Sequence, residues 1–302
     1  MKTFAFAAVL ALALTACQNM APRPAAHAAA AAQRVVVGRY DNHEQVWQAR
    51  GQGKAIAPPH LRVTLEAAGK PGWTLWRIDL DGTPPMSALW ALREDSSGPA
   101  PVLVPHRALV AAPATGKAFD PAQWAALDAC ALRSDAGRYA GDTATCTVLA
   151  PGIGTDMALL PLAITHDGEW LRLRLYADQA RGGDAREDLR RIQLFTGWAA
   201  LNGGGPKAAA DSQDWHMDRA LQIENEGGHY ALHWRDGSAS GYSLELERIA
   251  YQGGNVPVLK LAVIEDASGQ TLAYAWANPE ANRIGINLGW LQVGLERAAA
   301  TP

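Results

Sequence analysis

Short runs in which apolar and polar residues alternate recur along the chain and are typical of half-buried β-strands. Leu61–Glu66 and Thr74–Leu80 alternate on either side of the turn sequence Gly69–Gly72, which predicts a hairpin. In Glu169–Asp178 the leucines share one face of the expected strand, and the other face carries Trp170, Arg172, Arg174 and Tyr176. The 29 glycines and 18 prolines can supply many turns. We therefore expect a mainly β fold built from antiparallel strands.

Further strands are expected in both halves of the chain. In the first part they are Ala88–Arg93, Val102–Val110, Met157–Thr165 and Arg191–Leu201. In the last part they are Leu221–Asn225, Tyr230–Arg235, Tyr242–Tyr251, Val256–Ile264, Thr271–Ala277 and Gly285–Leu295. We interpret residues 202–213 (NGGGPKAAADSQ) as a linker between a first β region at 34–201 and a C-terminal β meander at 214–302. The pattern leaves open whether the meander is a separate domain or packs on the first region.

One short helix is expected in the first region. Asp120 has the character of an N-cap, Pro121 suits the first helical position, and Gln123 completes a capping box. Apolar residues then recur at helical spacing from Trp124 onward. The pattern predicts a helix of about ten residues that ends near Cys130.

The amino-terminal residues have the build of a bacterial lipoprotein signal. Met1-Lys2 supplies a positive start, residues 4–14 are apolar, and Leu14-Thr-Ala-Cys17 resembles a lipobox. The resemblance implies removal of residues 1–16 and lipidation of Cys17. The alternative is an ordinary secretory signal with a chance cysteine near its cleavage site.

A lipidated Cys17 would place the protein at a membrane surface. Residues 17–33, which include the low-complexity stretch Ala21–Ala32, would form a flexible tether. Gln18 follows the cysteine, and in well-studied lipoproteins a residue other than aspartate there implies transfer to the outer membrane. We expect a cell-envelope protein that is lipid-anchored, at the outer membrane, and faces the periplasm. No later apolar run is long enough to span a bilayer.

Two cysteines remain once Cys17 is assigned to the lipid. Cys130 and Cys146 are sixteen residues apart, and neither belongs to a CxxC motif of the kind that binds zinc. In an oxidising compartment they are natural disulfide partners. The alternative is a pair of buried free thiols.

Composition and motif spacing exclude several classes of function. The chain has 27 Lys and Arg against 30 Asp and Glu, a net charge of -3, which does not fit a nucleic-acid-binding surface. It lacks the GxSxG motif of serine hydrolases. His229 and His233 would lie about 13 Å apart along a strand, too far for one metal ion. We therefore expect no metal site.

Three segments of the first region occur in the order and spacing of a known family. Gly38–Gln45 (GRYDNHEQ) has Gly, an aromatic residue, Asn and Gln at matching positions, and Trp76-Arg77 lies where that family has a Tyr-Arg pair. The third segment comprises Leu127–Cys130, Tyr139–Gly141 and Cys146. Residues of about 34 to 201 thus resemble the CpcT/CpeT-like chromophore lyases. Nothing after about Leu201 belongs to the resemblance.

This resemblance implies a calyx-like antiparallel β-barrel, often a homodimer, that binds a linear tetrapyrrole. In some members the barrel attaches that bilin to a cysteine of a phycobiliprotein. The implied ligand site comprises Tyr40, Asn42, Gln45, Trp76 and Arg77. An inward-facing arginine could pair a ligand carboxylate, whereas an outward-facing Arg77, Arg172 or Arg174 would lie in solvent. Asp41 and Asn42 could also serve only to cap or turn the chain.

Two functions fit these observations. The first is an envelope lipoprotein whose barrel holds a tetrapyrrole or another flat, carboxylated apolar molecule, with bilin-lyase activity if the family chemistry is retained. The second is a non-enzymatic structural or interaction lipoprotein that docks a protein partner in the envelope. The chain departs from the family at Trp76 and at Asp128-Ala129 before the cysteine. These differences bear on the lyase chemistry rather than on the fold.

Overall fold

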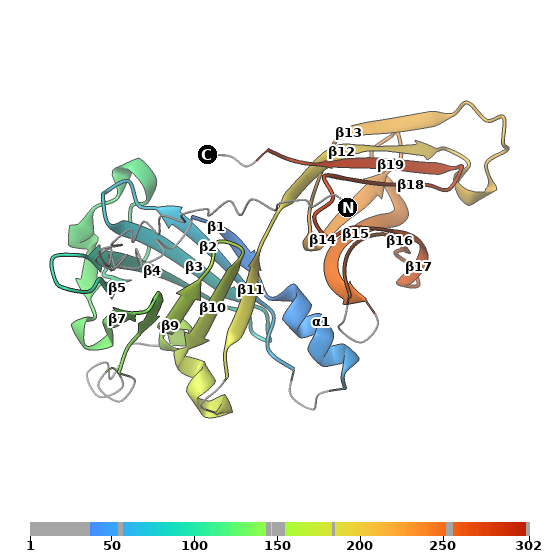
Figure 1. Ribbon diagram of the computed structural model, residues 1–302. Helices are drawn as coiled ribbons and strands as arrows, with labels where there is room; N and C mark the ends of the chain where they lie inside the picture. The colour runs from blue at the N-terminus through green and yellow to red at the C-terminus, as the bar shows by residue number, and fades with distance from the viewer. Residues whose placement is uncertain are drawn as a thin grey trace, which may run out of the picture.

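The protein folds into two β units joined by a short stretch of chain. The computed structural model describes residues 37–53, 57–142, 146, 155–182, 185–251 and 256–299. The first unit is a closed antiparallel β-barrel, and the second contains two antiparallel sheets, so the expected fold class is confirmed. In Figure 1 the barrel lies on the left and the second unit on the right. The predicted signal at 1–16, Cys17 and the tether at 17–33 lie outside the described residues.

Ten strands close the barrel in the order β4-β3-β2-β1-β11-β10-β9-β8-β7-β5. Pairing between β4 and β5 completes the ring, and β6 extends the sheet beyond β5. The strands are β1 Gly38–Asp41, β2 Leu61–Ala67, β3 Trp73–Leu80, β4 Met86–Asp95, β5 Val102–Ala108, β6 Trp124–Ala126, β7 Leu132–Asp135, β8 Arg138–Ala140, β9 Pro161–His166, β10 Trp170–Leu175 and β11 Glu187–Arg191.

The inside of the barrel is filled by large apolar side chains. Trp76 on β3 and Trp90 on β4 lie opposite each other and are each 1% exposed. They belong to one continuous core with Tyr40, and β10 contributes the leucines 171, 173 and 175 to the same core. The alternation predicted for Glu169–Asp178 is therefore confirmed, with its leucine face inside. Closing the sheet buries these side chains against one another, which is the main stabilising term of the unit.

The helix predicted over residues 120–130 is wrong. This segment forms a 3-10 turn at Pro121–Gln123, the strand β6 and a second 3-10 turn at Asp128–Cys130. Asp120 does act as a cap, because its carboxylate accepts the N–H of Ala122 at 3.0 Å. However, β6 pairs with β5, and Trp124 is buried against Phe119 on the outside of the barrel. Tertiary pairing and burial thus outweigh the local helix signal.

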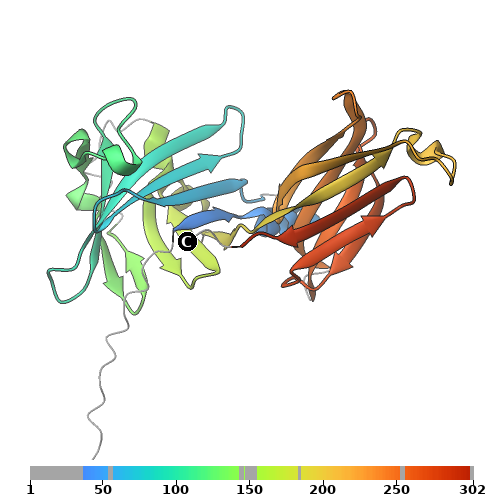
Figure 2. The ribbon, with the colours of Figure 1, turned by 90° about the horizontal axis from the view of Figure 1, so that it is seen from above.

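Helix α1 (His43–Gly51) begins inside the GRYDNHEQ segment. Its first turn is fixed by Asp41, whose carboxylate accepts the N–H of His43 at 2.8 Å. The helix contacts β11 of the barrel and also β14 and β15 of the second unit. Figure 2 shows it, in blue, between the two units. Helix α1 is therefore a structural connection between them.

The second unit is a sandwich of two four-stranded sheets. One sheet has the order β13-β12-β19-β18 and the other is the meander β14-β15-β16-β17. The strands are β12 Leu194–Asn202, β13 Trp215–Glu224, β14 Glu226–His233, β15 Ala239–Tyr251, β16 Val256–Glu265, β17 Gln270–Ala277, β18 Arg283–Asn287 and β19 Leu291–Arg297. Phe195 and Val293 from the first sheet share a buried core with Leu246 and Leu261 from the second. The C-terminal region therefore has a hydrophobic core of its own.

The domain boundary predicted at residue 201 is wrong. Strand β12 pairs with β13 and β19, so residues 194–201 belong to the C-terminal unit. Residues 202–213 connect two strands of one sheet, and Asn202 anchors this connection through Ser212. The chain crosses between units at Ile192-Gln193, between β11 and β12. Glycine and polar residues serve long hairpin connections as well as linkers, so composition alone misplaced the boundary.

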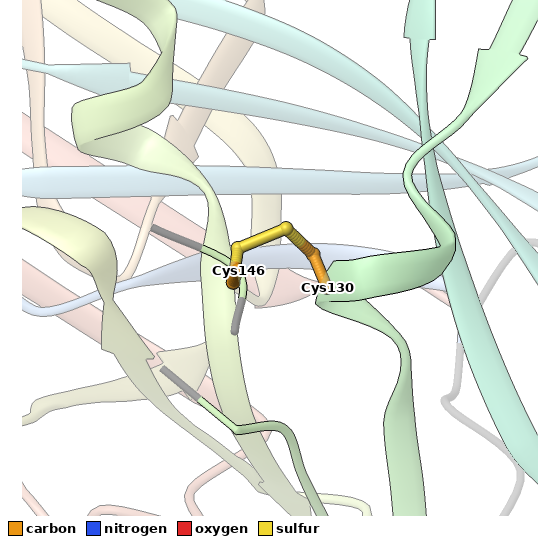
Figure 3. Close-up of a disulfide and its surroundings, with 2 residues drawn as sticks. All are labelled: Cys130 and Cys146. Atoms are coloured by element: carbon orange, nitrogen blue, oxygen red, sulfur yellow. A yellow bond between two sulfur atoms is a disulfide. The ribbon is translucent and has the colours of Figure 1, made fainter. Parts of the chain in front are cut away.

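Cys130 and Cys146 form a disulfide, as predicted, with their Cα atoms 4.6 Å apart (Figure 3). Both side chains are buried in the barrel core. The bond joins the 3-10 turn before β7 to Cys146. It ties together a part of the barrel where β7 and β8 have only four and three residues.

Candidate functional site: the groove between the two units

Tyr40 lies in the packed barrel core and not at the mouth of a cup. Its hydroxyl lies 3.0 Å from Nε2 of His166, and both side chains are buried. Burial raises the pKa of Tyr40 to about 12. The residue therefore acts as a neutral core side chain with a polar partner, a common role for buried tyrosine.

Asn42 and Gln45 hold the start of α1 to the barrel. The Asn42 amide donates to the carbonyl oxygen of Pro59 at 2.8 Å and to Glu187 Oε2 at 3.0 Å. Gln45 donates to the backbone oxygen of Arg186 at 2.9 Å. Asn42 also contacts Gln45 directly, at 3.3 Å. Of the two sequence interpretations, these contacts match the local structural one, because the amide groups bond within the protein.

Trp76 and Arg77 point in opposite directions from β3. Trp76 is buried in the barrel core, whereas Arg77 is exposed on the outer face, between Thr64 and Leu89 of the neighbouring strands. The expectation that Arg77 points into the barrel is therefore wrong. Strand geometry requires this outcome, because successive side chains alternate between faces and Trp76 occupies the inner one.

The two arginines of β10 also lie on the outside. Arg172 pairs with Asp167 at 2.9 Å, and Arg174 alternates with the buried leucines. The outer-face alternative for both residues is thus the correct one. With Tyr40 and Trp76 filling the interior, the described part of the barrel offers a packed core where we expected a cup.

A concave site with a volume of about 930 Å³ lies between the two units. It is an open groove bordered by β1, β2 and the β11–β12 crossing on one side and by β13, β14 and the end of β19 on the other. Its lining includes Gly38, Arg39, Arg62, Arg191, Ile192, Gln193, Leu194, Gln222, Ile223, Glu224, Gly227, Gly228, His229, Arg297, Ala298 and Ala299. Small-molecule sites commonly have this volume and commonly form at domain interfaces.

Four arginines and one carboxylate give the groove an excess of positive charge. Arg39 and Arg62, from the barrel, both pair with Glu224 of the sandwich, and Arg62 lies 3.4 Å from that carboxylate. Arg62 also pairs with buried Asp41 at 3.1 Å. These pairs fix two guanidinium groups at the wall of the groove. Because only one carboxylate lines the groove, the four arginines are not fully neutralised and can attract an anion.

Arg191 differs from the other three arginines. Among the described residues it pairs with no carboxylate, and its one hydrogen bond is to the backbone oxygen of Val37 at 3.3 Å. Arg297 pairs with Glu280 at 3.6 Å and lies over the ring of Phe195. Arg191 is therefore the side chain best placed to bind a carboxylate or another anion that enters the groove.

A buried ionic network forms the floor of the junction. Arg190 of the barrel makes two hydrogen bonds to Glu226 of the sandwich, at 2.7 and 2.9 Å. It also pairs with Glu44 of α1 and bonds to the backbone oxygen of Arg248. Burial raises the pKa of Glu226 to about 7, although Arg190 opposes the shift. The network holds the two units in register and thereby fixes the walls of the groove.

Two histidines extend this network along the junction. His43 of α1 lies 3.0 Å from Glu247 of the sandwich, which also pairs with Lys260 at 2.9 Å. His60 donates to Asp41 at 2.7 Å and to Asp81 at 2.6 Å. Because both partners are carboxylates, which accept hydrogen bonds, the two contacts favour the protonated imidazole. The hydrogen bond to Asp41, assisted by Asp81, raises its pKa to about 8.

Sequence reasoning missed this site. Of its lining residues, it had discussed His229 as a metal ligand, and Gly38 and Arg39 only as part of the Gly38–Gln45 segment. One usable signal exists in Glu187–Arg191 (EDLRR), a strand with four charged residues, which is unusual for a strand packed on both faces. Among the described residues there is no group of three His, Cys, Asp or Glu suited to a metal ion. No helix in the described part of the chain has the length and apolar character needed to cross a membrane.

Comparison with known proteins finds no matching family, no curated relative and no similar solved structure.

Proposed function

We propose that this protein is a lipid-anchored envelope protein that binds an apolar molecule with one or more carboxylates in the groove between its two units. The observation that carries the proposal is the guanidinium of Arg191, which pairs with no carboxylate among the described residues and lies in a positively charged groove of about 930 Å³. The ligand chemistry is the one expected from the sequence. The proposed binding site, however, is the groove between the two units and not the interior of the barrel.

The groove offers both kinds of contact that such a ligand needs. Ile192, Leu194 and Ala298 supply apolar surface, and Arg191 stands beside them with its donors uncommitted to a carboxylate. Burial of the apolar part would supply most of the affinity, and a bidentate arginine–carboxylate pair would fix the orientation. A flat tetrapyrrole with propionates satisfies both conditions, as does a fatty acid.

The proposed location rests on the sequence. Lipidation of Cys17 would anchor the protein, most simply at the periplasmic face of the outer membrane, and a groove that faces the periplasm could collect a ligand there. We leave bilin attachment out of the proposal. Among the described residues the groove holds guanidinium, amide and imidazole groups, which suit binding more directly than covalent transfer.

The test is a titration with matched variants. The oxidised chain from Gln33 to Pro302 is mixed in turn with biliverdin, haem, a long-chain fatty acid and the fatty alcohol of equal length, and tryptophan fluorescence and visible spectra are followed. Saturable micromolar binding of a carboxylated compound is expected, and the alcohol should bind more weakly. Arg191→Ala should weaken binding about tenfold or more, the usual range for a charged hydrogen bond.

Arg77→Ala is the matched control, because it removes the same charge from the exposed outer face of the barrel. It should bind with wild-type affinity, and both variants should keep the wild-type circular dichroism. Equal affinity of Arg191→Ala and Arg77→Ala, or no saturable binding of any compound, would refute the proposal.

The second candidate is a non-enzymatic interaction protein of the envelope. The filled barrel supports it, since Trp76, Trp90 and Tyr40 occupy the space that a ligand in a cup would need. In that case the junction charges would serve only to hold the units together, and the titration above would show no binding.

A further inference from the structure

Strand β17 is an edge strand that lacks most of the usual protection against pairing with another chain. Its one irregularity is a shift of register against β16 at Leu272. The strand pairs with β16 on one side, and within the described residues no strand of its sheet lies on the other side. Its sequence, QTLAYAWA, contains no charged residue, proline or glycine. Natural proteins usually place charges, prolines, bulges or glycines on such edges, because free backbone groups there bind further strands.

The other three sheet edges of the sandwich do carry such features. Strand β13 has Asp218 and Arg219, and β18 has Arg283 and a central glycine. Strand β14 has two glycines and two shifts of register against β15. Strand β17 has one shift of register, at Leu272, but no charge and no glycine, so it is the edge most open to strand addition.

Large side chains stand out from one face of β17. Leu272, Tyr274 and Trp276 are 40%, 57% and 43% exposed, and their spacing of two residues puts them in one row. The Tyr274 and Trp276 rings stack, with centroids 5.1 Å apart. The opposite face carries alanines, of which Ala277 packs on the sandwich core. An exposed apolar row on an open edge is typical of an interaction surface.

We infer that β17 pairs with β17 of a second copy, in an antiparallel and twofold-symmetric manner, and joins the two four-stranded sheets into one. Centring the pair on Tyr274 places Leu272 of each copy opposite Trp276 of the other. All six side chains then lie on one face of the joined sheet, as cross-strand pairs require. The inference does not depend on ligand binding in the groove.

A second copy fits this edge better than a partner of different chemistry, for two reasons. The strand is uncharged, so two copies can meet without apposing like charges, whereas a charged peptide would find no complementary group on β17 itself. The row is also self-complementary about Tyr274, which is what a twofold interface demands. Eight residues make a small interface, below the roughly 800 Å² per partner of a standard stable complex, so the dimer should be reversible.

The test is sedimentation velocity of the oxidised chain from Gln33 to Pro302, over micromolar to submillimolar concentrations. The wild type should shift from monomer to dimer with concentration. Tyr274→Lys sets two like charges together at the twofold axis and should raise the dissociation constant by about tenfold or more. Mixing Tyr274→Lys with Tyr274→Glu should restore the dimer, because opposite charges then meet.

Met217→Lys is the matched control, since Met217 is 44% exposed on the charged edge strand β13. It should dimerise like the wild type. A wild type that stays monomeric throughout, or a Tyr274→Lys variant that dimerises like the wild type, would overturn the inference. Binding of the monomeric wild type to phosphatidylethanolamine–phosphatidylglycerol vesicles, lost in Tyr274→Lys, would assign the row to a lipid surface instead.

Discussion

Arg190 of the barrel and Glu226 of the sandwich form a bidentate ion pair in which both side chains are almost completely buried, at 2% and 0% exposure. The pair joins residues 36 positions apart, on strands of different units. The Arg190 guanidinium also lies over the ring of Trp170, 5.3 Å from its centroid. The relative position of the two units, and hence the groove between them, depends on this contact.

Removing one partner of the Arg190–Glu226 pair should be strongly destabilising. Arg190→Met leaves Glu226 buried without its partner, and we expect a loss of about 3–5 kcal/mol in the free energy of unfolding. Arg190→Met combined with Glu226→Met should be less destabilising than Arg190→Met alone, because no buried charge is then left unpaired. Urea denaturation monitored by tryptophan fluorescence measures these effects. A single variant as stable as the wild type would contradict a structural role for the pair.

The protonation of His60 should make stability depend on pH. Its pKa in the folded protein, about 8, lies above the ordinary histidine value of about 6.5. The folded state therefore binds the proton more tightly, and the stabilisation is fully present below pH 6.5 and is lost as the pH rises through 8. After allowance for solvent screening we expect an effect of about 1 kcal/mol.

The check is the free energy of unfolding of the wild type and His60→Gln between pH 6 and 9. The difference between the two proteins should shrink as the pH increases. His216→Gln is a suitable control, because this histidine has no ion-pair partner among the described residues. A difference that stays constant with pH would show that Asp41 and Asp81 do not stabilise a charged His60.

The Cys130–Cys146 bond should leave the mature protein without a free thiol if Cys17 carries the lipid. Unfolded but unreduced protein should then resist maleimide labelling, and reduction should expose two thiols. Cys130→Ser combined with Cys146→Ser should lower the free energy of unfolding by about 3 kcal/mol, according to the chain-entropy treatment of a loop this size. Labelling before reduction would show that the disulfide is incomplete in solution.

Lipidation predicts how the protein partitions in cells. Cys17→Ser should move it from the membrane fraction to the soluble envelope fraction, because the acyl chains provide the anchor. Carbonate washing and fractionation measure this, with Cys130→Ser plus Cys146→Ser as a control that leaves Cys17 in place. Persistence of Cys17→Ser in washed membranes would refute the lipid as the anchor.

Gly197 should tolerate no side chain. A Cβ at this position of β12 would collide with the carbonyl oxygen of Gly294 on β19. Gly197→Ala should therefore destabilise the protein by about 1–3 kcal/mol, the usual range for overpacking. Gly51→Ala is the matched control, because a Cβ there meets no atom within 4 Å and α1 gains a better helix former. In thermal unfolding, the melting temperature of Gly197→Ala should fall below that of the wild type. The melting temperature of Gly51→Ala should rise or stay the same.

Most strands could be predicted because their signal is local. Thr74–Leu80 alternates and lies in β3, and Tyr242–Tyr251 lies in β15. The helix at 120–130 could not be excluded from the sequence, because the capping signal of Asp120 is real and only the burial of Trp124 against Phe119 decides the outcome. Residues 191–201 were predicted as one strand, but the chain crosses from the barrel to the sandwich within them. Only the pairing of the strands shows that β11 and β12 belong to different sheets.

Most residues of the candidate site could not be predicted from the sequence. Gly38–Gln45 was singled out as part of a ligand site, but the polar side chains of Asn42 and Gln45 bond within the protein. The residues of the groove come from seven strands of two units, and Arg191 and Glu224 are brought to it by the crossing of the chain at residue 192. These residues are far apart in the sequence and come together only when the sheets form, so no sequence spacing identifies them as one site.

The sequence by itself determined most of the β-strands, the leucine face of Glu169–Asp178 and the partners of the disulfide, because alternation and the count of cysteines are properties of the chain. Tertiary structure alone decided that Tyr40 and Trp76 fill the barrel, that α1 joins the units, and that four arginines meet at one groove. The physical reason is that burial and ion pairing depend on which surfaces come together. A strand pattern fixes the faces of a strand but not its neighbours across the fold.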